Sequence, residues 1–176
     1  MIRKLDISQQ TKKIMTDYKR QTVNFADCYV LTNKRTKEFI LTFLDSFLLN
    51  RQEYADVYEI PQFSDHPTIV FNSANELMEY LEQNKKEPHA IYWYNEEEEA
   101  QLRGAMCLFT SDGQIILGLT CETLYPDTTI ERNYLKALMD LCSSAQGLIE
   151  YKTPAPRDTG EFLQRIATQQ TRNSNF

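Results

Sequence analysis

The sequence is poor in the residues on which many metal, nucleotide and redox sites depend. It contains only five glycines and two histidines among 176 residues. A phosphate-binding loop needs several glycines at fixed spacing, and neither a Walker nor a dinucleotide-binding pattern occurs. The four cysteines (Cys28, Cys107, Cys121 and Cys142) form no CxxC pair, so buried free thiols are expected rather than zinc ligands or disulfides. No cofactor and no metal site is therefore predicted.

Long apolar runs are also missing. No run approaches the roughly 20 residues that a bilayer-spanning helix needs. Residues 1–6 lack the apolar stretch of a secretory signal. We therefore expect a cytoplasmic protein without membrane contact. With 41% hydrophobic and 11% aromatic residues, the chain can form a real core, and one domain over residues 1–176 is expected.

Charge is distributed unevenly along the chain. Residues 1–37 contain nine Lys/Arg and three Asp/Glu, residues 38–99 contain three and fourteen, and residues 100–176 contain seven and eight. The acidic middle would repel phosphate, so nucleic acid is not an expected partner. It favours a basic partner instead, although a merely solvated acidic surface is the alternative interpretation.

Apolar periodicity predicts an α/β domain of the α+β type, with a mixed, mainly antiparallel central sheet of about five strands packed by helices. Residues 1–27 are expected to form a basic N-terminal segment, helical over 7–20, and residues 168–176 a frayed tail. The other expected helices cover 36–49, 73–84, 128–142 and a segment from 159, and the expected strands cover 28–32, 68–71, 90–94, 105–110, 114–120 and 148–152.

Local signals mark turns and helix starts. Capping-box spacing at Ser73, Thr128 and Asp158 predicts three helix N-termini. Asp112-Gly113 between two apolar runs predicts a hairpin with a type I′ turn. Residues 50–67 show no clean period and are expected to form a long loop, functional or packed by its own side chains.

Standard catalytic arrangements are not found. His66 and His89 lie in loop-like stretches with no partner nearby in sequence, and the turn explains Asp112. We therefore do not expect an enzyme. A small hydrolase or transferase with an unrecognised site stays open, and a pocket that gathers a histidine with a cysteine or carboxylate would favour it.

Three stretches are similar to a known family. They are 43–51 continuing to 58–65, Ile91-Tyr92-Trp93, and 105–119. Their order and spacing resemble an uncharacterised family of small bacterial proteins associated with polymorphic-toxin loci, which are candidate immunity proteins. The resemblance covers residues 29–163. It implies binding rather than catalysis, with a cognate toxin made in the same cell as partner, and it supplies no catalytic residues.

An acidic surface suits a basic toxin through steering and complementarity. The candidate partner-binding residues come from the unpatterned loop, the aromatic strand and the run of glutamates: Glu53, Asp56, Glu59, Asp65, Trp93, Glu96, Glu97, Glu98 and Glu99. A scaffolding or homo-oligomeric protein is the further alternative, and a large apolar surface patch would favour it.

Overall fold

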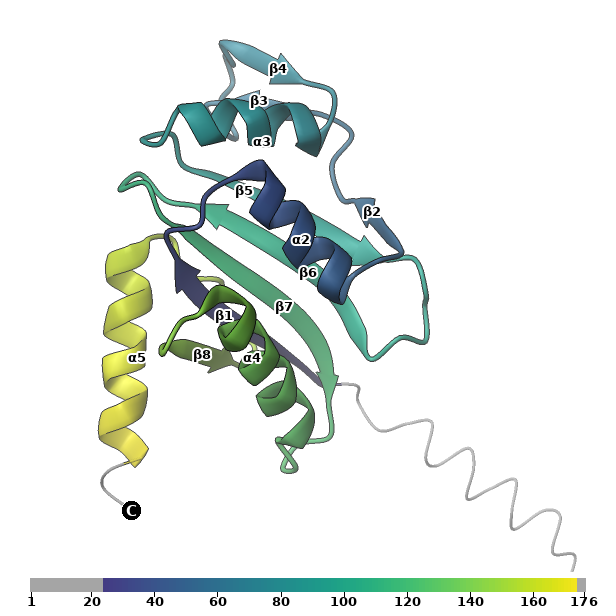
Figure 1. Ribbon diagram of the computed structural model, residues 1–176, viewed down its shortest axis with the longest axis vertical. Coiled ribbons are helices and arrows are strands. Elements are labelled where there is room, and N and C mark those ends of the chain that lie inside the picture. Colours follow the sequence, from purple (N-terminus) through teal and green to yellow (C-terminus); the bar gives the residue numbers. More distant parts are fainter. Residues whose placement is uncertain (1–23, 174–176) are drawn as a thin grey trace, which may run out of the picture.

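The computed structural model describes residues 24–173, and a six-stranded sheet forms its centre (Figure 1). The spatial strand order is β2-β5-β6-β7-β1-β8, and each pairing in it is antiparallel. This confirms the α+β class. The strands are β1 (Asn24–Thr32), β2 (Arg51–Glu53), β5 (His89–Asn95), β6 (Leu102–Phe109), β7 (Ile115–Thr123) and β8 (Gly147–Glu150).

The described residues form four helices, α2 (Lys37–Phe47), α3 (Ala74–Gln83), α4 (Thr129–Cys142) and α5 (Thr159–Asn173). Ser73 and Asp158 cap α3 and α5 as predicted, because their side chains accept from the main-chain N–H groups of Glu76 and Glu161. Thr128 is the N-cap of α4 as predicted, but its side chain makes no capping hydrogen bond; Asp127 accepts from Thr129 N–H instead. Within residues 24–173, no helix is both long enough and apolar enough to cross a membrane.

The helices cover the two faces of the sheet unequally. Buried residues of α2, α3 and α4 pack on one face, which we call the first face, in a single cluster with Cys28, Ile91 and Leu117. Of the helices within residues 24–173, only α5 packs on the second face, where Phe162 and Ile166 join a smaller cluster. Figure 1 shows α2 and α4 in front of the sheet and α5 at its left. In the described part of the chain, some of the second face therefore has no helix over it.

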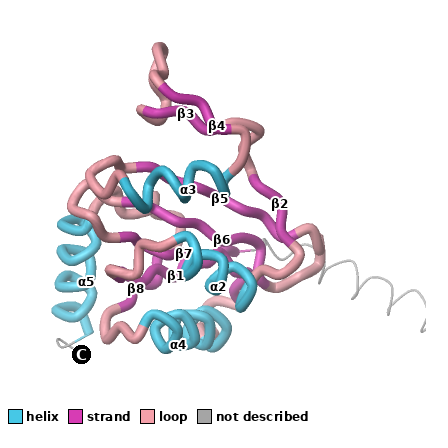
Figure 2. The backbone as a smooth tube through the Cα atoms, turned by 45° about the horizontal axis from the view of Figure 1, so that its top comes forward, coloured by secondary structure: helices cyan, strands magenta, loops and turns pink. Residues whose placement is uncertain are grey.

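The structure corrects three expectations about chain organisation. Residues 24–27 belong to β1 rather than to a helical segment, and residues 1–23 lie outside the described part. The prediction of a frayed tail is wrong for residues 168–173, because helix α5 continues to Asn173. Residues 174–176 lie outside the described part. The 50–67 loop contains β2 and β3 (Tyr58–Ile60). Strand β3 pairs with β4 (Ile69–Phe71) in a separate two-stranded ribbon (Figure 2), and Tyr58 and Ile60 of β3 are buried in the core.

The β6–β7 hairpin is confirmed, but its turn differs from the expected type. Of its two central residues only Gly113 has a positive φ, at 87°, whereas a type I′ turn needs two. Thr110 N–H donates to the Gln114 carbonyl at 3.1 Å, which closes a three-residue loop. Such loops place glycine at the left-handed position. Asp112-Gly113 therefore predicted the hairpin correctly, but the loop is a three-residue loop rather than a type I′ turn.

Arg35 follows β1 and is only 3% exposed, and its guanidinium lies over the Phe109 ring. Burial lowers the pKa of its guanidinium, while the charges of Asp112 and Glu87 oppose that shift. The guanidinium donates five hydrogen bonds to main-chain carbonyls, those of Thr110 (2.6 Å), Glu87 (2.8 Å), Gln114 (3.1 Å), Leu81 (3.2 Å) and Asn84 (3.3 Å). The α3 terminus and the β6–β7 hairpin are thereby tied to the end of β1.

We predict that Arg35→Lys lowers the free energy of unfolding by about 2–4 kcal/mol, because a three-donor ammonium cannot replace a planar guanidinium fork. Urea unfolding measures the change. Arg132→Lys, at an exposed position on α4, is the matched control and should change stability by less than about 0.5 kcal/mol. Equal stability of Arg35→Lys and wild type would mean that the charge alone is sufficient.

Candidate partner-binding surface

Four large exposed side chains gather beside β5. Their exposed fractions are 78% for Tyr54, 48% for Val57, 88% for Phe63 and 40% for Tyr92. All four line one hollow of about 360 Å³, and we call them the Tyr92 surface. Single exposed apolar residues are ordinary, but a contiguous group around a depression marks an interaction site.

Hydrogen bonds to the edge of β5 hold the segment that carries three of these side chains. Tyr54 N–H donates to the Tyr92 carbonyl at 3.0 Å. Farther along, the Gln62 amide makes both main-chain bonds of Ala90, accepting at 2.8 Å and donating at 3.0 Å. A side chain thus occupies the position of a neighbouring strand, and Pro88 supplies no donor beyond it. A partner must therefore recognise this edge through side chains rather than by adding a strand.

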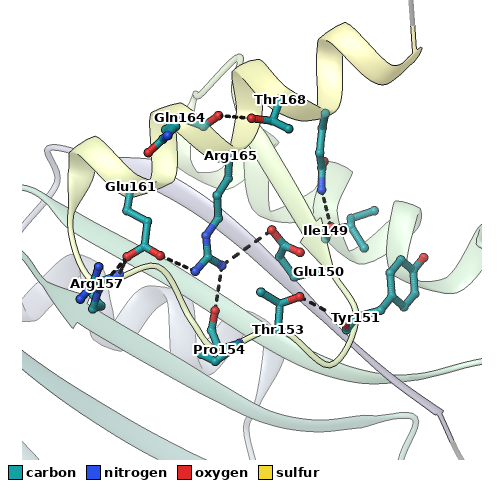
Figure 3. Close-up of polar contacts among 11 residues, drawn as sticks. Ile149, Glu150, Tyr151, Thr153, Pro154, Arg157, Glu161, Gln164, Arg165 and Thr168 are labelled. Atoms are coloured by element: carbon teal, nitrogen blue, oxygen red, sulfur yellow. Dashed lines mark hydrogen bonds and ion pairs between the residues drawn. The ribbon is translucent and has the colours of Figure 1, made fainter. Parts of the chain in front are cut away.

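Residues 154–157, which precede α5, form the wall of a second hollow. Pro156 and Arg157 line this hollow of about 360 Å³ together with Phe63 and Tyr92. Arg165 fixes this wall: it donates to the Pro154 carbonyl at 2.8 Å, bonds Glu161 at 2.6 Å and lies 3.7 Å from Glu150 (Figure 3). The main-chain N–H of Arg157, followed by the two arginine side chains, lowers the pKa of Glu161 to about 2.

A third hollow, of about 390 Å³, opens on the uncovered part of the second face. Gly104 and Thr120 lie in it beside Tyr54, Tyr92 and Arg103. The sheet has a register shift between Leu102 and Gly104, where Arg103 forms an ion pair with Glu122 of β7. Tyr92 lines all three hollows, and so it lies at the centre of the depressed area.

Carboxylates and two arginines lie around this apolar area, with Arg157 in the second hollow and Arg103 in the third. Asp56 and Asp65 are exposed on the segment that carries Phe63, and Glu59 is half-buried and lines the first hollow. Residues 52–84 contain seven Asp/Glu and no Lys/Arg. The structure therefore places Glu59 in the first hollow, and it places Asp56 and Asp65 on the segment that carries the exposed side chains.

Two of the predicted residues point into the fold instead. Trp93 is only 5% exposed and belongs to the core cluster that contains residues of α2 and α3, and it also lines the third hollow. The exposed rings of this strand are those of Tyr92 and Tyr94, because side chains alternate between the two faces. The Glu53 carboxylate accepts from Ala74 N–H at 2.8 Å and from the Tyr58 hydroxyl at 3.0 Å, which fixes the start of α3.

The run Glu96–Glu99 forms a separate acidic group. Its four side chains are exposed in the turn between β5 and β6, at the Asn95 end of β5. The Glu97 carboxylate accepts from the Asn50 amide at 2.7 Å, which ties this turn to the α2–β2 connection. The first hollow lies at the His89–Tyr92 end of β5, so the structure separates this run from the Tyr92 surface.

The sequence did not single out Tyr54, Val57 or Phe63, because the segment from 50 to 67 has no period that would show which side chains face outward. Its several aromatic residues were the only available signal. Gln62 was also missed, since nothing in a sequence distinguishes a glutamine that caps a strand edge from one that faces solvent.

His89 lines the first hollow together with Glu59 and the second hollow together with Glu87, so the histidine–carboxylate combination that would favour the small-enzyme alternative is present. His89 is buried, with Nε2 3.2 Å from the Glu59 carbonyl and Nδ1 3.1 Å from the Ala90 carbonyl, while His66 is exposed. All four cysteines are free and buried, and burial raises the pKa of Cys142 to about 11. Among residues 24–173, no three His, Cys, Asp or Glu side chains are placed to hold a metal ion.

We predict that His89 makes the fold sensitive to mild acid. Burial lowers its pKa below the usual 6.5, although the two carbonyls oppose this shift. The unfolded state therefore takes up the proton first, and stability falls as the pH drops below about 6.5. His89→Gln should lose less stability than wild type between about pH 7.5 and about pH 5.5, as measured by urea unfolding. His66→Gln is the control, and an equal loss in all three proteins would contradict the prediction.

A scan against models of protein families finds no match, and searches of curated proteins and of solved structures find none either. The resemblance of residues 29–163 to candidate immunity proteins therefore stays a prediction. The case for a binding surface depends on the geometry and charge of Tyr92 and its surroundings.

Proposed function

We propose that this chain is an immunity-type binding protein that neutralises a basic toxin made in the same cell by direct association. The observation that carries the proposal is the Tyr92 surface, where four large exposed side chains line one hollow. Tyrosine and other aromatic residues dominate the binding energy of protein interfaces. The resemblance noted in the sequence supports the same class of function.

The charge around the surface supports a basic partner. Asp56 and Asp65 are exposed on the segment that carries Phe63, and residues 52–84 contain no Lys/Arg. Arg103 and Arg157 line two of the hollows, but each forms an ion pair with a glutamate, Glu122 and Glu161 respectively. Complementary charge accelerates association and suppresses wrong partners. A second copy of the chain would bring the same carboxylates face to face in a two-fold interface, because such an interface pairs a patch with itself. Self-association through this surface is therefore disfavoured.

The first experiment is co-expression. The toxin gene adjacent to the gene for this chain should stop growth when expressed alone, and wild-type chain should restore growth. The purified proteins should then form a complex of defined stoichiometry. If no adjacent product is toxic, or if toxicity is unaffected by this chain, the proposal is wrong.

Charge reversal locates the interface. We predict that Asp56→Lys with Asp65→Lys lowers the association rate for the toxin by about tenfold and weakens its dependence on salt, because favourable steering is lost. Stopped-flow association at several salt concentrations measures both quantities. The fold should be unaffected, since both side chains are exposed.

The matched control is Glu98→Lys with Glu99→Lys, which changes the net charge equally but at the separate acidic turn. Its effect on the association rate should be smaller. If this second pair produces the larger loss, the interface lies over the β5–β6 turn, and the assignment to the Tyr92 surface is wrong.

A further inference from the structure

Phe63 is the most exposed of the large apolar side chains that the structure describes, at 88%. Its backbone φ is 61°, in the left-handed region. A residue with a Cβ is disfavoured there, and bulky residues more so than Asn or Asp. A strained backbone usually persists because the side chain or its neighbours gain something in return. Here the ring buries almost no area, so the fold itself gains little from having phenylalanine at this position.

The chain on both sides of Phe63 is held in place. The Gln62 amide makes two hydrogen bonds to Ala90 of β5. Ser64 N–H donates to the Pro61 carbonyl at 3.3 Å, and the Ser64 hydroxyl accepts from His66 N–H at 3.1 Å. The ring is thus presented from a fixed backbone, which reduces the ordering cost of binding.

Phe63 also stands between two depressions. It lines the hollow bounded by Tyr54 and Val57, and it lines the hollow bounded by Pro156 and Arg157. Each measures about 360 Å³. A partner that fills both hollows would enclose the ring from two sides, and aromatic residues in that situation contribute most to affinity.

We infer that Phe63 is the anchor of the interface, a ring that the partner receives in an apolar pocket surrounded by Lys and Arg side chains. The inference rests on the proposed function and specifies how the partner is recognised. The apolar pocket matches the ring, and the cations match Asp65 beside it and Asp56 on the same segment. The acidic surroundings disfavour a nucleic-acid base as the occupant, because its phosphates would be repelled.

The decisive variant is Phe63→Asn, because asparagine tolerates a left-handed φ better than phenylalanine does. Its thermal unfolding midpoint should equal or exceed that of wild type. The probe is the toxin whose growth inhibition this chain relieves, purified as an inactive variant. The dissociation constant for that toxin should rise at least about 30-fold, as expected when an anchor residue is removed.

The matched control is Leu124→Asn. Leu124 is 64% exposed and lines none of the three hollows, so its loss should leave the dissociation constant unchanged. An equal rise of the dissociation constant in both variants would mean that general surface hydrophobicity drives binding, which overturns the inference. A midpoint for Phe63→Asn several degrees below wild type would also overturn it, because the ring would then support the fold.

The outcomes separate the two proposals. If wild type relieves toxicity and Phe63→Asn binds equally well, the proposed function stands and the anchor is wrong. If wild type relieves no toxicity, the proposed function fails. Sedimentation of wild type and of Phe63→Asn then tests whether the ring binds a second copy of the chain. If wild type self-associates and Phe63→Asn does not, the ring binds a second copy of the chain. That result would also overturn the inference that the partner is a basic protein.

Discussion

The guanidinium of Arg35 ties the end of β1 to two parts of the chain, residues 81–87 and 110–114, that lie far from it in sequence. Its five acceptors are main-chain carbonyls at the end of α3, before β5 and at the β6–β7 hairpin. Carbonyls in the last turn of a helix lack partners within the helix and carry partial negative charge, so a buried cation suits them without a carboxylate. The connection from α3 to β5 is thereby fixed, and with it His89 and Ala90, to which the Tyr92 surface is attached.

Glutamine amides satisfy open main-chain groups at both sides of the sheet. Gln62 does so on β5, and Gln169 of α5 donates to the Ile149 carbonyl of β8 at 2.8 Å. Unpaired strand edges invite association with other chains. Because these groups already have partners, the exposed rings at Tyr92 are the more available contact, and contact through side chains allows greater selectivity than strand pairing does.

The sequence predicted the elements whose signals are local. Periodicity located the helices from Thr36 and Ser73, and continuous apolar runs located β6 and β7 as central strands. Strands β2 and β3 were missed because each has only three residues, and their pairing depends on partners distant in the chain. For the candidate site, the carboxylates at 56, 59 and 65 were predicted from charge. The inward positions of Glu53 and Trp93 were not predicted, because strand register decides to which face of the sheet a side chain points.

The attachment of residues 54–65 has a consequence for how binding specificity can change. The segment is held through main-chain atoms, the Gln62 amide and the buried side chains of Tyr58 and Ile60, while Tyr54, Val57 and Phe63 contribute mainly to its outer surface. Exchanging those three side chains therefore alters what the surface recognises without disturbing the sheet beneath it. In engineering terms the scaffold and the recognition surface are separable, and randomised libraries at these positions provide a route to binders with new targets.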